Sequence, residues 1–231
     1  SNLQISAGSA GRAMTLSGTA SFVDNCIIEG GLVNSAGTTG TVLFSNATTL
    51  RNCVIIHRGT GAHHIIATQT ASPFLYNCTV VAPCDLGDSP EYVFMSGASG
   101  TVTVQNCALF IGDPTKTLAT GSATMAYTTC VSDIDGTAGV TRATFGAEYQ
   151  NAGNAATDLR LSSMSAQIDA GTTDATNAAT DIKGTARPVE AAYDIGCWES
   201  TFTVSSKLSA PYLRSRRPRV HDARSRRKGR R

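Results

Sequence analysis

Short apolar runs recur along the first 130 residues, and Gly, Ser, Thr and Asn separate them. Each period of about 25 residues contains three such runs. The first runs lie at 14–16, 42–44, 65–67 and 92–95, the second at 22–23, 50, 74–76 and 102–104, and the third at 27–28, 54–56, 79–81 and 108–110. No long stretch carries a helical apolar stripe, so the pattern predicts three short strands per period. Three strands repeated at least four times are typical of a solenoid.

An Asn-Cys pair stands between the second and third run of each period. The copies are Asn25-Cys26, Asn52-Cys53, Asn77-Cys78 and Asn106-Cys107, followed by the degenerate Thr129-Cys130. Asn tolerates the left-handed conformation of a sharp corner, and stacked amides can hydrogen-bond from coil to coil. The next side chain points into a narrow interior, where the small hydrophobic Cys fits. We therefore expect the four Asn-Cys pairs to form a structural ladder.

The repeat predicts an all-β protein, a right-handed single-stranded parallel β-helix of about five coils. One coil cannot bury its apolar side chains alone, whereas coils stacked about 4.8 Å apart share a core. We expect β-helix coils over residues 1–144, a C-terminal coil and irregular cap over 145–206, and an arginine-rich extended tail over 207–231. No apolar run approaches the ~18 residues of a membrane span. Because there is no initiator Met, we expect Ser1 to be a processed or truncated start.

The seven cysteines allow three interpretations. Buried free thiols suit the ladder positions, because free Cys usually behaves as a small buried hydrophobe. A disulfide framework is disfavoured, since parallel ladder side chains point the same way and the number of cysteines is odd. A zinc site would need paired C-x-x-C spacings, which the chain lacks, so we expect no metal and no cofactor. Cys84 and Cys197 fall outside the ladder.

Residues 158–199 have a different pattern. They contain Asp158-Leu159-Arg160-Leu161, then SAQIDAG from Ser165, DIKGTARP from Asp181 and DIGCWE from Asp194. This order resembles the closing motif of choice-of-anchor Q proteins, D-x-R-L, S-x-x-I-D-x-G, D-x-x-G-x-x-R-P and D-I-G-x-x-E, with Cys197 where a small residue such as Ala is usual. The Asn-Cys coils resemble the broader pectin-lyase-like β-helix superfamily, and the two resemblances cover about residues 14–200. The choice-of-anchor Q resemblance implies a bacterial surface or secreted β-helix protein and says little about activity.

The carboxylates and Arg187 of this segment could be read as a catalytic cluster or as a cap. The last coil of a β-helix leaves backbone groups unpaired, and something must cover it. Asp and Arg in turns, with Trp198 as an apolar plug, would do so. We therefore expect the segment to cap the open last coil.

The pectin-lyase-like resemblance also raises polysaccharide cleavage. Lyases of that superfamily use clustered Asp with calcium and a proton-abstracting Arg, whereas its hydrolases use two or three Asp on neighbouring coils with a His. The candidates in this chain are His57, His63, His64, Asp85 and Asp88. His57 and Asp85 follow successive Asn-Cys strands at comparable places, so they could share a face. Neither the Asp-Asp nor the Arg-x-Pro-x-Arg pattern is present, so we assign no catalytic residue.

The charge of the chain is divided between a body and a tail. Residues 207–231 carry a net charge of +10, and residues 1–206 carry −8. Such a tail cannot bury enough apolar area to fold alone. Arg makes forked contacts to phosphate and carboxylate, so we expect the tail to bind nucleic acid or an acidic protein surface. The residues expected to do so are Arg214, Arg216, Arg217, Arg219, Arg224, Arg226, Arg227, Lys228, Arg230 and Arg231.

Three functions follow as alternatives from these features. The preferred one is a non-enzymatic structural protein of a large assembly, a phage virion, where the chain would be a head decoration or tail component beside capsid or tail proteins. The first alternative is a secreted or cell-surface bacterial protein that binds glycans on its β-helix face or mediates adhesion. The second is a polysaccharide lyase or hydrolase. A homo-oligomer is compatible with each of them.

Overall fold

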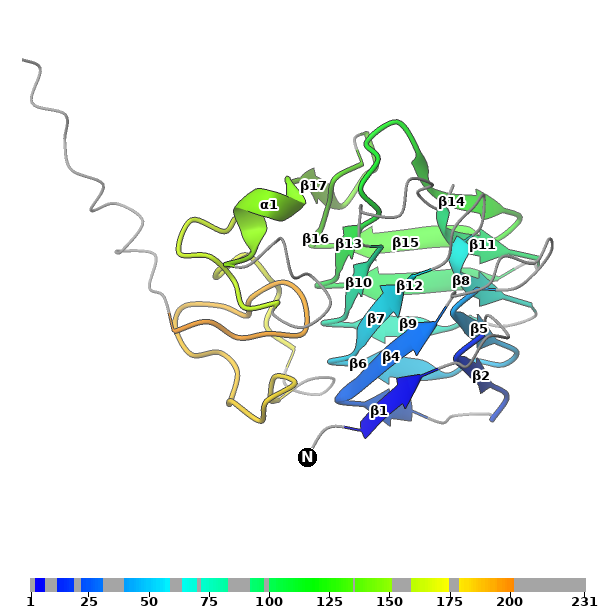
Figure 1. The fold of residues 1–231 in the computed structure, drawn as a ribbon, viewed down its shortest axis with the longest axis horizontal. Helices are drawn as coiled ribbons and strands as arrows, with labels where there is room; N and C mark the ends of the chain where they lie inside the picture. Colours follow the sequence, from blue (N-terminus) through cyan, green and yellow to red (C-terminus); the bar gives the residue numbers. More distant parts are fainter. Residues whose placement is uncertain are drawn as a thin grey trace, which may run out of the picture.

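The computed structural model describes residues 3–6, 12–18, 22–30, 40–58, 64–69, 72–82, 92–97, 100–134, 136–150, 159–174 and 179–201. Over these residues the chain winds into a β-helix with three parallel sheets. The C-terminal segment (145–150, 159–174 and 179–201) lies beside it, on the left in Figure 1. The predicted fold class, an all-β parallel β-helix, is confirmed.

The three sheets take one strand each from successive coils. Sheet A contains β1 (Leu3–Ser6), β4 (Cys26–Gly30), β7 (Val54–His57), β10 (Thr79–Val81), β13 (Ala108–Phe110), β16 (Cys130–Ser132) and β17 (Val140–Arg142). Sheet B contains β2 (Met14–Leu16), β5 (Val42–Phe44), β8 (His64–Thr68), β11 (Tyr92–Ser96) and β14 (Thr117–Gly121). Sheet C contains β3 (Phe22–Asp24), β6 (Thr49–Arg51), β9 (Phe74–Tyr76), β12 (Thr101–Gln105) and β15 (Thr124–Thr128). The short helix α1 (Phe145–Glu148) follows β17.

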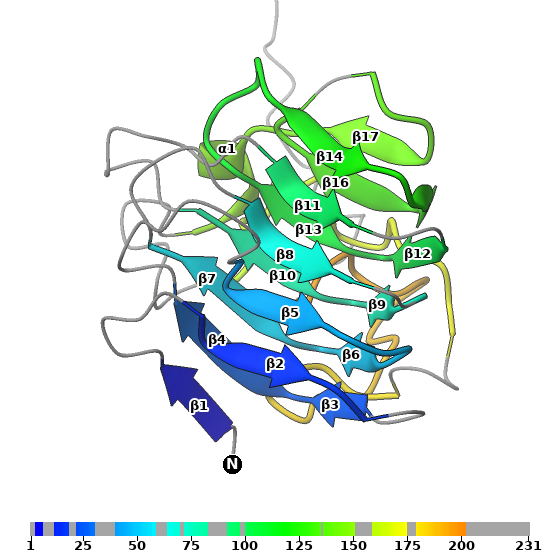
Figure 2. The ribbon, with the colours of Figure 1, turned by 90° about the vertical axis from the view of Figure 1, so that its right-hand side faces the viewer.

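Each coil runs from sheet B through sheet C to sheet A, and the next coil repeats this order one strand further along (Figure 2). The pairing is parallel, and equivalent residues face one another. Across sheet C, for example, one row consists of Val23, Leu50, Leu75, Val104 and Tyr127. Because such rows point inward, the apolar side chains of successive coils form columns that fill the interior.

A residue in the left-handed conformation forms the corner between sheet C and sheet A in every coil. The φ angle lies between 49° and 53° at Asn25, Asn52, Asn77, Asn106 and Thr129. The backbone N–H of each of these Asn residues donates to a carbonyl of the next coil, as Asn52 does to Tyr76 at 3.0 Å. The corners therefore continue the hydrogen-bond ladders of the flanking sheets.

The Cys after each corner points into the interior. Cys53, Cys78 and Cys107 are fully buried, and Cys130 extends the column into the fifth coil. The six cysteines within the described residues are free thiols, so the disulfide alternative is wrong for them. Burial raises the pKa of Cys130 to about 11, which keeps this thiol protonated. Cys84 lies outside the described residues.

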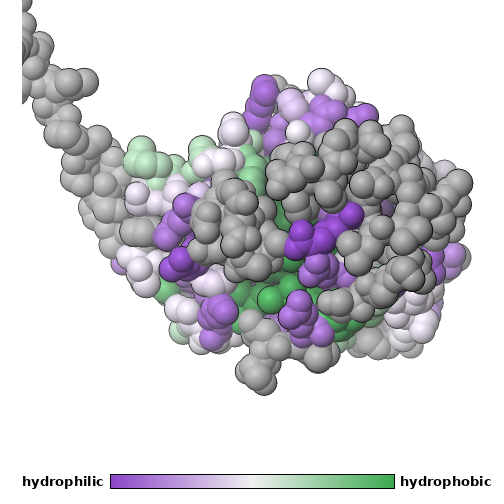
Figure 3. All heavy atoms as spheres, in the orientation of Figure 1, coloured by the Kyte–Doolittle hydropathy of each residue, from purple (hydrophilic) through white to green (hydrophobic). Residues whose placement is uncertain are grey.

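The C-terminal segment packs along the outer face of sheet A. Side chains of both form a second apolar cluster, which includes Val54, Ile56, Val81, Phe110, Val131, Tyr149, Leu161, Ile168, Ile195 and Cys197. The strands β7, β10, β13 and β16 are consequently buried on both faces. Figure 3 shows the molecule from the same side as Figure 1. Apolar residues gather in the middle of the face that is turned to the viewer, with polar residues above and below them.

This placement corrects the expectation that residues 158–199 cover the open last coil. The segment lies on the side of the β-helix, and Trp198 packs at the edge of the second cluster. The last coil is instead followed by the turn between β16 and β17. Ile134 of this turn is buried in the interior cluster. Gly139 of this turn has a φ of 78° and lies so close to Tyr127 that a Cβ would be 2.1 Å from its carbonyl oxygen. The apolar outer face of sheet A extends along several coils and needs a cover of the same length. This explains why the C-terminal segment lies on the side of the β-helix.

The fifth corner is a place where the chain can be stabilised. Thr129 is β-branched, so the left-handed conformation has a higher steric cost for this residue than for an Asn. We expect Thr129→Asn to raise the free energy of unfolding by about 0.5–1 kcal/mol. The reciprocal change, Asn106→Thr, should lower it by about 1–3 kcal/mol, because two hydrogen bonds to Thr172 are lost as well. Urea midpoints of the two variants test this, and a Thr129→Asn protein no more stable than the parent would contradict it.

Candidate functional site

The outer face of sheet C is open to solvent along its central strands. In its strands β6, β9 and β12, buried residues alternate with partly or fully exposed ones. By contrast, β7, β10 and β13 of sheet A and β5 and β8 of sheet B are buried throughout. Among the described strands, the outer face of sheet C along β6, β9 and β12 is therefore a regular surface that a partner could contact.

Aromatic side chains, neutral polar side chains and the Asp24–Arg51 ion pair make up this face. Two rows cross the strands, one with Phe22, Thr49, Phe74 and Thr103, and one with Asp24, Arg51, Tyr76, Gln105 and Thr128. Phe22 is 63 % exposed, and the Arg51 guanidinium lies 4.5 Å from the centre of its ring. The rings of Phe74 and Tyr76 are stacked with their centres 6.1 Å apart. Arg51 also forms a two-pronged ion pair with Asp24, so the two charges compensate each other.

This arrangement suits a ring-shaped polar ligand. Aromatic faces stack on the apolar side of such a ring, while Thr, Gln and the Asp24–Arg51 pair offer hydrogen bonds to its hydroxyl groups. The aromatic residues stand on β3 and β9, with β6 between them, so they lie about two strand spacings of ~4.8 Å apart. Burial, together with the charge of Asp174, raises the pKa of Tyr76, so its phenol stays a neutral donor.

The candidate catalytic histidines do not line this face. His57 is 4 % exposed at the end of β7, with Nδ1 2.9 Å from Thr41 Oγ1, and His64 is 3 % exposed at the start of β8. His63, Asp85 and Asp88 lie outside the described residues, as do the tail residues from Arg214 to Arg231. Within the described ranges, no group of three or more His, Cys, Asp and Glu side chains is arranged to hold a metal ion. In the same ranges no helix is long and apolar enough to cross a membrane.

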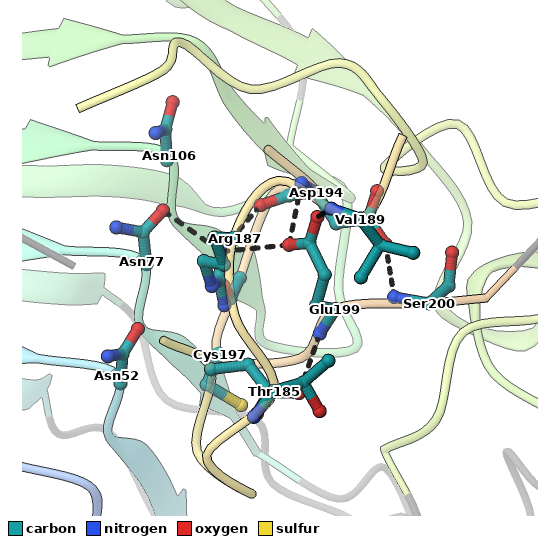
Figure 4. A network of polar contacts seen from close by, with 12 residues as sticks. Asn52, Asn77, Asn106, Thr185, Arg187, Val189, Asp194, Cys197, Glu199 and Ser200 are labelled. Atoms are coloured by element: carbon teal, nitrogen blue, oxygen red, sulfur yellow. Dashed lines mark hydrogen bonds and ion pairs between the residues drawn. The ribbon is translucent and has the colours of Figure 1, made fainter. Parts of the chain in front are cut away.

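Arg187 joins the C-terminal segment to a corner of the β-helix (Figure 4). Its buried guanidinium donates from Nη1 to Asn77 Oδ1 at 3.2 Å and to the Asp194 carbonyl at 3.0 Å. From Nη2 it donates to the Gly196 carbonyl at 2.8 Å. A carboxylate oxygen of Glu199 lies 3.6 Å from Nη1, and both side chains are excluded from solvent. One planar cation therefore links the third coil to two turns of the segment.

Two further corner amides bind the same segment. Asn52 Nδ2 donates to the Thr180 carbonyl at 2.5 Å. Asn106 exchanges two hydrogen bonds with Thr172, from Nδ2 to its carbonyl at 2.7 Å and from its N–H to Oδ1 at 2.8 Å. The expectation of amide bonds from coil to coil is wrong for Asn52, Asn77 and Asn106, whose amides bond the C-terminal segment and not one another (Figure 4). No periodic signal along the chain pointed to these partners.

Carboxylates hold the irregular turns of the C-terminal segment. Each accepts hydrogen bonds from at least two backbone N–H groups, and they are Asp169, Asp181, Asp194 and Glu199. These N–H groups have no strand or helix partner, so the carboxylates satisfy donors that would otherwise be lost in the interior. Their arrangement is that of turn-stabilising groups, in agreement with a structural role for this segment.

Burial raises the pKa of Glu199 to about 7, although the Val189 N–H and Arg187 favour its charged form. Between its ordinary pKa of 4.5 and this value, the folded state binds a proton that the unfolded state releases. Stability from this group is therefore greatest below pH 4.5 and declines as the pH rises through 7. We expect the melting temperature to rise when the pH is lowered from 8 to 6.

The matched variants are Glu199→Gln, which removes the titrating group, and Glu190→Gln, which changes an exposed glutamate of the same segment. Glu199→Gln should flatten the pH dependence of the melting temperature, and Glu190→Gln should leave it unchanged. Equal pH profiles for all three proteins would contradict the assignment to Glu199.

Comparisons with known proteins do not place the chain in a family. No protein-family model, no curated protein and no solved structure matches it. The β-helix is established by the strand order and register of the chain itself. What the protein does must accordingly be argued from its own surfaces and charges.

Proposed function

We propose that the chain is a non-enzymatic structural protein of a large assembly, such as a head decoration or tail component of a phage virion. The observation that carries this proposal is the burial of sheet A on both faces, with the C-terminal segment held to three corner asparagines. These contacts hold the described body together as one unit, and apolar side chains fill its interior. A protein with that geometry serves as a rigid spacer or platform.

The division of charge supports the same role. The body has a net charge of −8 and the tail has a net charge of +10. The chain would therefore combine a platform with a tail that anchors it to an anionic surface. The tail residues 207–231 are rich in Arg, whose planar fork matches phosphate and carboxylate groups. The partner would be an acidic surface of capsid or tail proteins, or packaged nucleic acid.

Fractionation of particles tests the proposal. In a density gradient of material from its source, the full chain should sediment with particles, and deletion of 207–231 should move it to the soluble fractions. A matched variant with every tail Arg changed to Lys keeps the charge and should retain only part of the binding, since the forked contacts are lost. A full chain found only as a free protein would overturn the assembly role.

A second candidate function is favoured by the open face of sheet C. It is that of a secreted or cell-surface bacterial β-helix protein that binds glycans or mediates adhesion. The stacked Phe74 and Tyr76 rings and the exposed Phe22 support it. So do the resemblances to choice-of-anchor Q proteins and to the pectin-lyase-like superfamily. The polysaccharide lyase or hydrolase alternative has less support, because His57 and His64 are buried.

A glycan array with the full chain tests this second function. If neutral glycans bind to sheet C, Tyr76→Ala should weaken the binding about tenfold, which corresponds to the loss of one aromatic stacking contact. Met164→Ala is the control, because Met164 is 68 % exposed but lies on the C-terminal segment. Binding that is equally sensitive to both changes, or absent from the array, would rule out sheet C as a glycan surface.

A further inference from the structure

A hollow of about 300 Å³ lies at the end of the β-helix where sheets B and C stop. Among the described strands, β14 and β15 are the last of these two sheets, whereas sheet A continues with β17 (Figure 2). The turn that leads into β17 borders the hollow and is held by the bond from the Cys130 N–H to the Gly139 carbonyl at 3.0 Å. Three elements therefore surround the hollow, and their lining residues include Leu118, Ala119, Met125, Tyr127, Thr137 and Ala138.

The hollow arises because an inward row of the last coil ends in a small residue. Across sheet B, one row consists of Val42, Ile66, Phe94 and Ala119. Phe94 is fully buried, and Ala119 in the next coil fills much less space and is partly exposed. Met125 is likewise partly exposed, although its neighbour in the preceding coil is a fully buried valine. Apolar surface that earlier coils bury is therefore open to a ligand at this place.

Tyr127 brings a polar group into these apolar surroundings. It ends the inward row of sheet C, whose four preceding members are the aliphatic residues Val23, Leu50, Leu75 and Val104. Within the described part of the chain, its hydroxyl oxygen is buried and completes no hydrogen bond. Burial raises the pKa of Tyr127, so the hydroxyl keeps its proton and can donate it. A buried hydroxyl without a partner destabilises the fold, and an acceptor supplied by a ligand removes that cost.

We propose that this hollow binds a small neutral molecule that is mostly apolar and carries one hydrogen-bond acceptor. The apolar part packs against Leu118, Ala119 and Met125, and the acceptor takes the bond from the Tyr127 hydroxyl. A change of rotamer at Met125 gives access to this hydroxyl, and an unbranched side chain is suited to such an adjustment.

The size and charge of the hollow narrow the class of ligand. A volume of about 300 Å³ lies at the lower end of the range for small-molecule sites, so it suits a single substituted ring. None of the residues that line it is charged, which disfavours an ionic ligand, because an ion would lose its hydration without gaining a partner. The site is separate from the outer face of sheet C and does not depend on the proposed function.

The methyl group of Met125 gives a local readout. The chain has four methionines, so protein labelled with ¹³C-methyl methionine gives four methyl signals, and Met125→Leu identifies the one from the hollow. Acetophenone, a ring with one carbonyl acceptor, is the probe. It should move the Met125 signal saturably with a dissociation constant of about 1 mM, as is usual for a ligand of so few atoms. The signal of Met164, which is exposed on the C-terminal segment, should stay in place. No saturable shift at Met125, or an equal shift at Met164, would refute the proposal.

Tyr127→Phe separates the hydrogen bond from the packing. This variant keeps the ring and loses the hydroxyl, so it should bind acetophenone about fivefold more weakly. Ethylbenzene, which lacks the acceptor, should bind the parent and the variant equally. Tyr76→Phe is the matched control, because it removes a tyrosine hydroxyl on the outer face of sheet C and should bind acetophenone like the parent. Undiminished binding of acetophenone to Tyr127→Phe contradicts the assigned contact.

The same spectrum tests whether another copy of the chain fills the hollow. If the end of the β-helix packs against a second copy, the Met125 signal moves with protein concentration in the absence of acetophenone. That outcome contradicts a small-molecule site. We expect a Met125 signal that does not change with protein concentration.

Discussion

Parallel backbone pairing between consecutive coils is the interaction on which the rest of the structure depends. The strands have three to five residues each, and none would be stable as an isolated pair. They are held because every coil repeats the register of the one before it, with an Asn or Thr corner at a φ near 50° and a buried Cys after it. A shift of one residue at a corner would turn the inward row of the next strand to the surface.

The same pairing makes the C-terminal segment necessary. Sheet A presents apolar side chains on both faces, so its outer face must be covered along several coils. The segment that covers it is irregular, and its backbone donors are satisfied by carboxylates instead of by a sheet. The buried pair of Arg187 and Glu199 costs desolvation, and the hydrogen bonds to Asn77 and to two carbonyls offset this cost. These directional contacts fix where the segment docks.

The repeat was readable from the sequence because its period, apolar runs and Asn-Cys corners are local properties of the chain. The docking of residues 159–201 on sheet A was missed, although a signal existed. The runs Val54-Ile55-Ile56 and Ala108-Leu109-Phe110 are continuously apolar, which indicates burial on both faces, whereas Thr101 to Gln105 alternates. The partners of Asn52, Asn77 and Asn106 lie 66 to 128 residues away in an aperiodic segment, so no pattern could have named them. The burial of His57 is equally invisible in spacing alone.

Because the interior is filled and the outer face of sheet A is covered, the protein must act through its remaining surfaces. The open face of sheet C has compensated charges, so it suits neutral partners. The tail differs from this face, because its charge of +10 is attracted to its own body of −8. Over a Debye length of ~8 Å that attraction competes with any external partner. If the tail is the anchor proposed above, it should select partners of higher charge density than the body, such as nucleic acid or a strongly acidic protein surface.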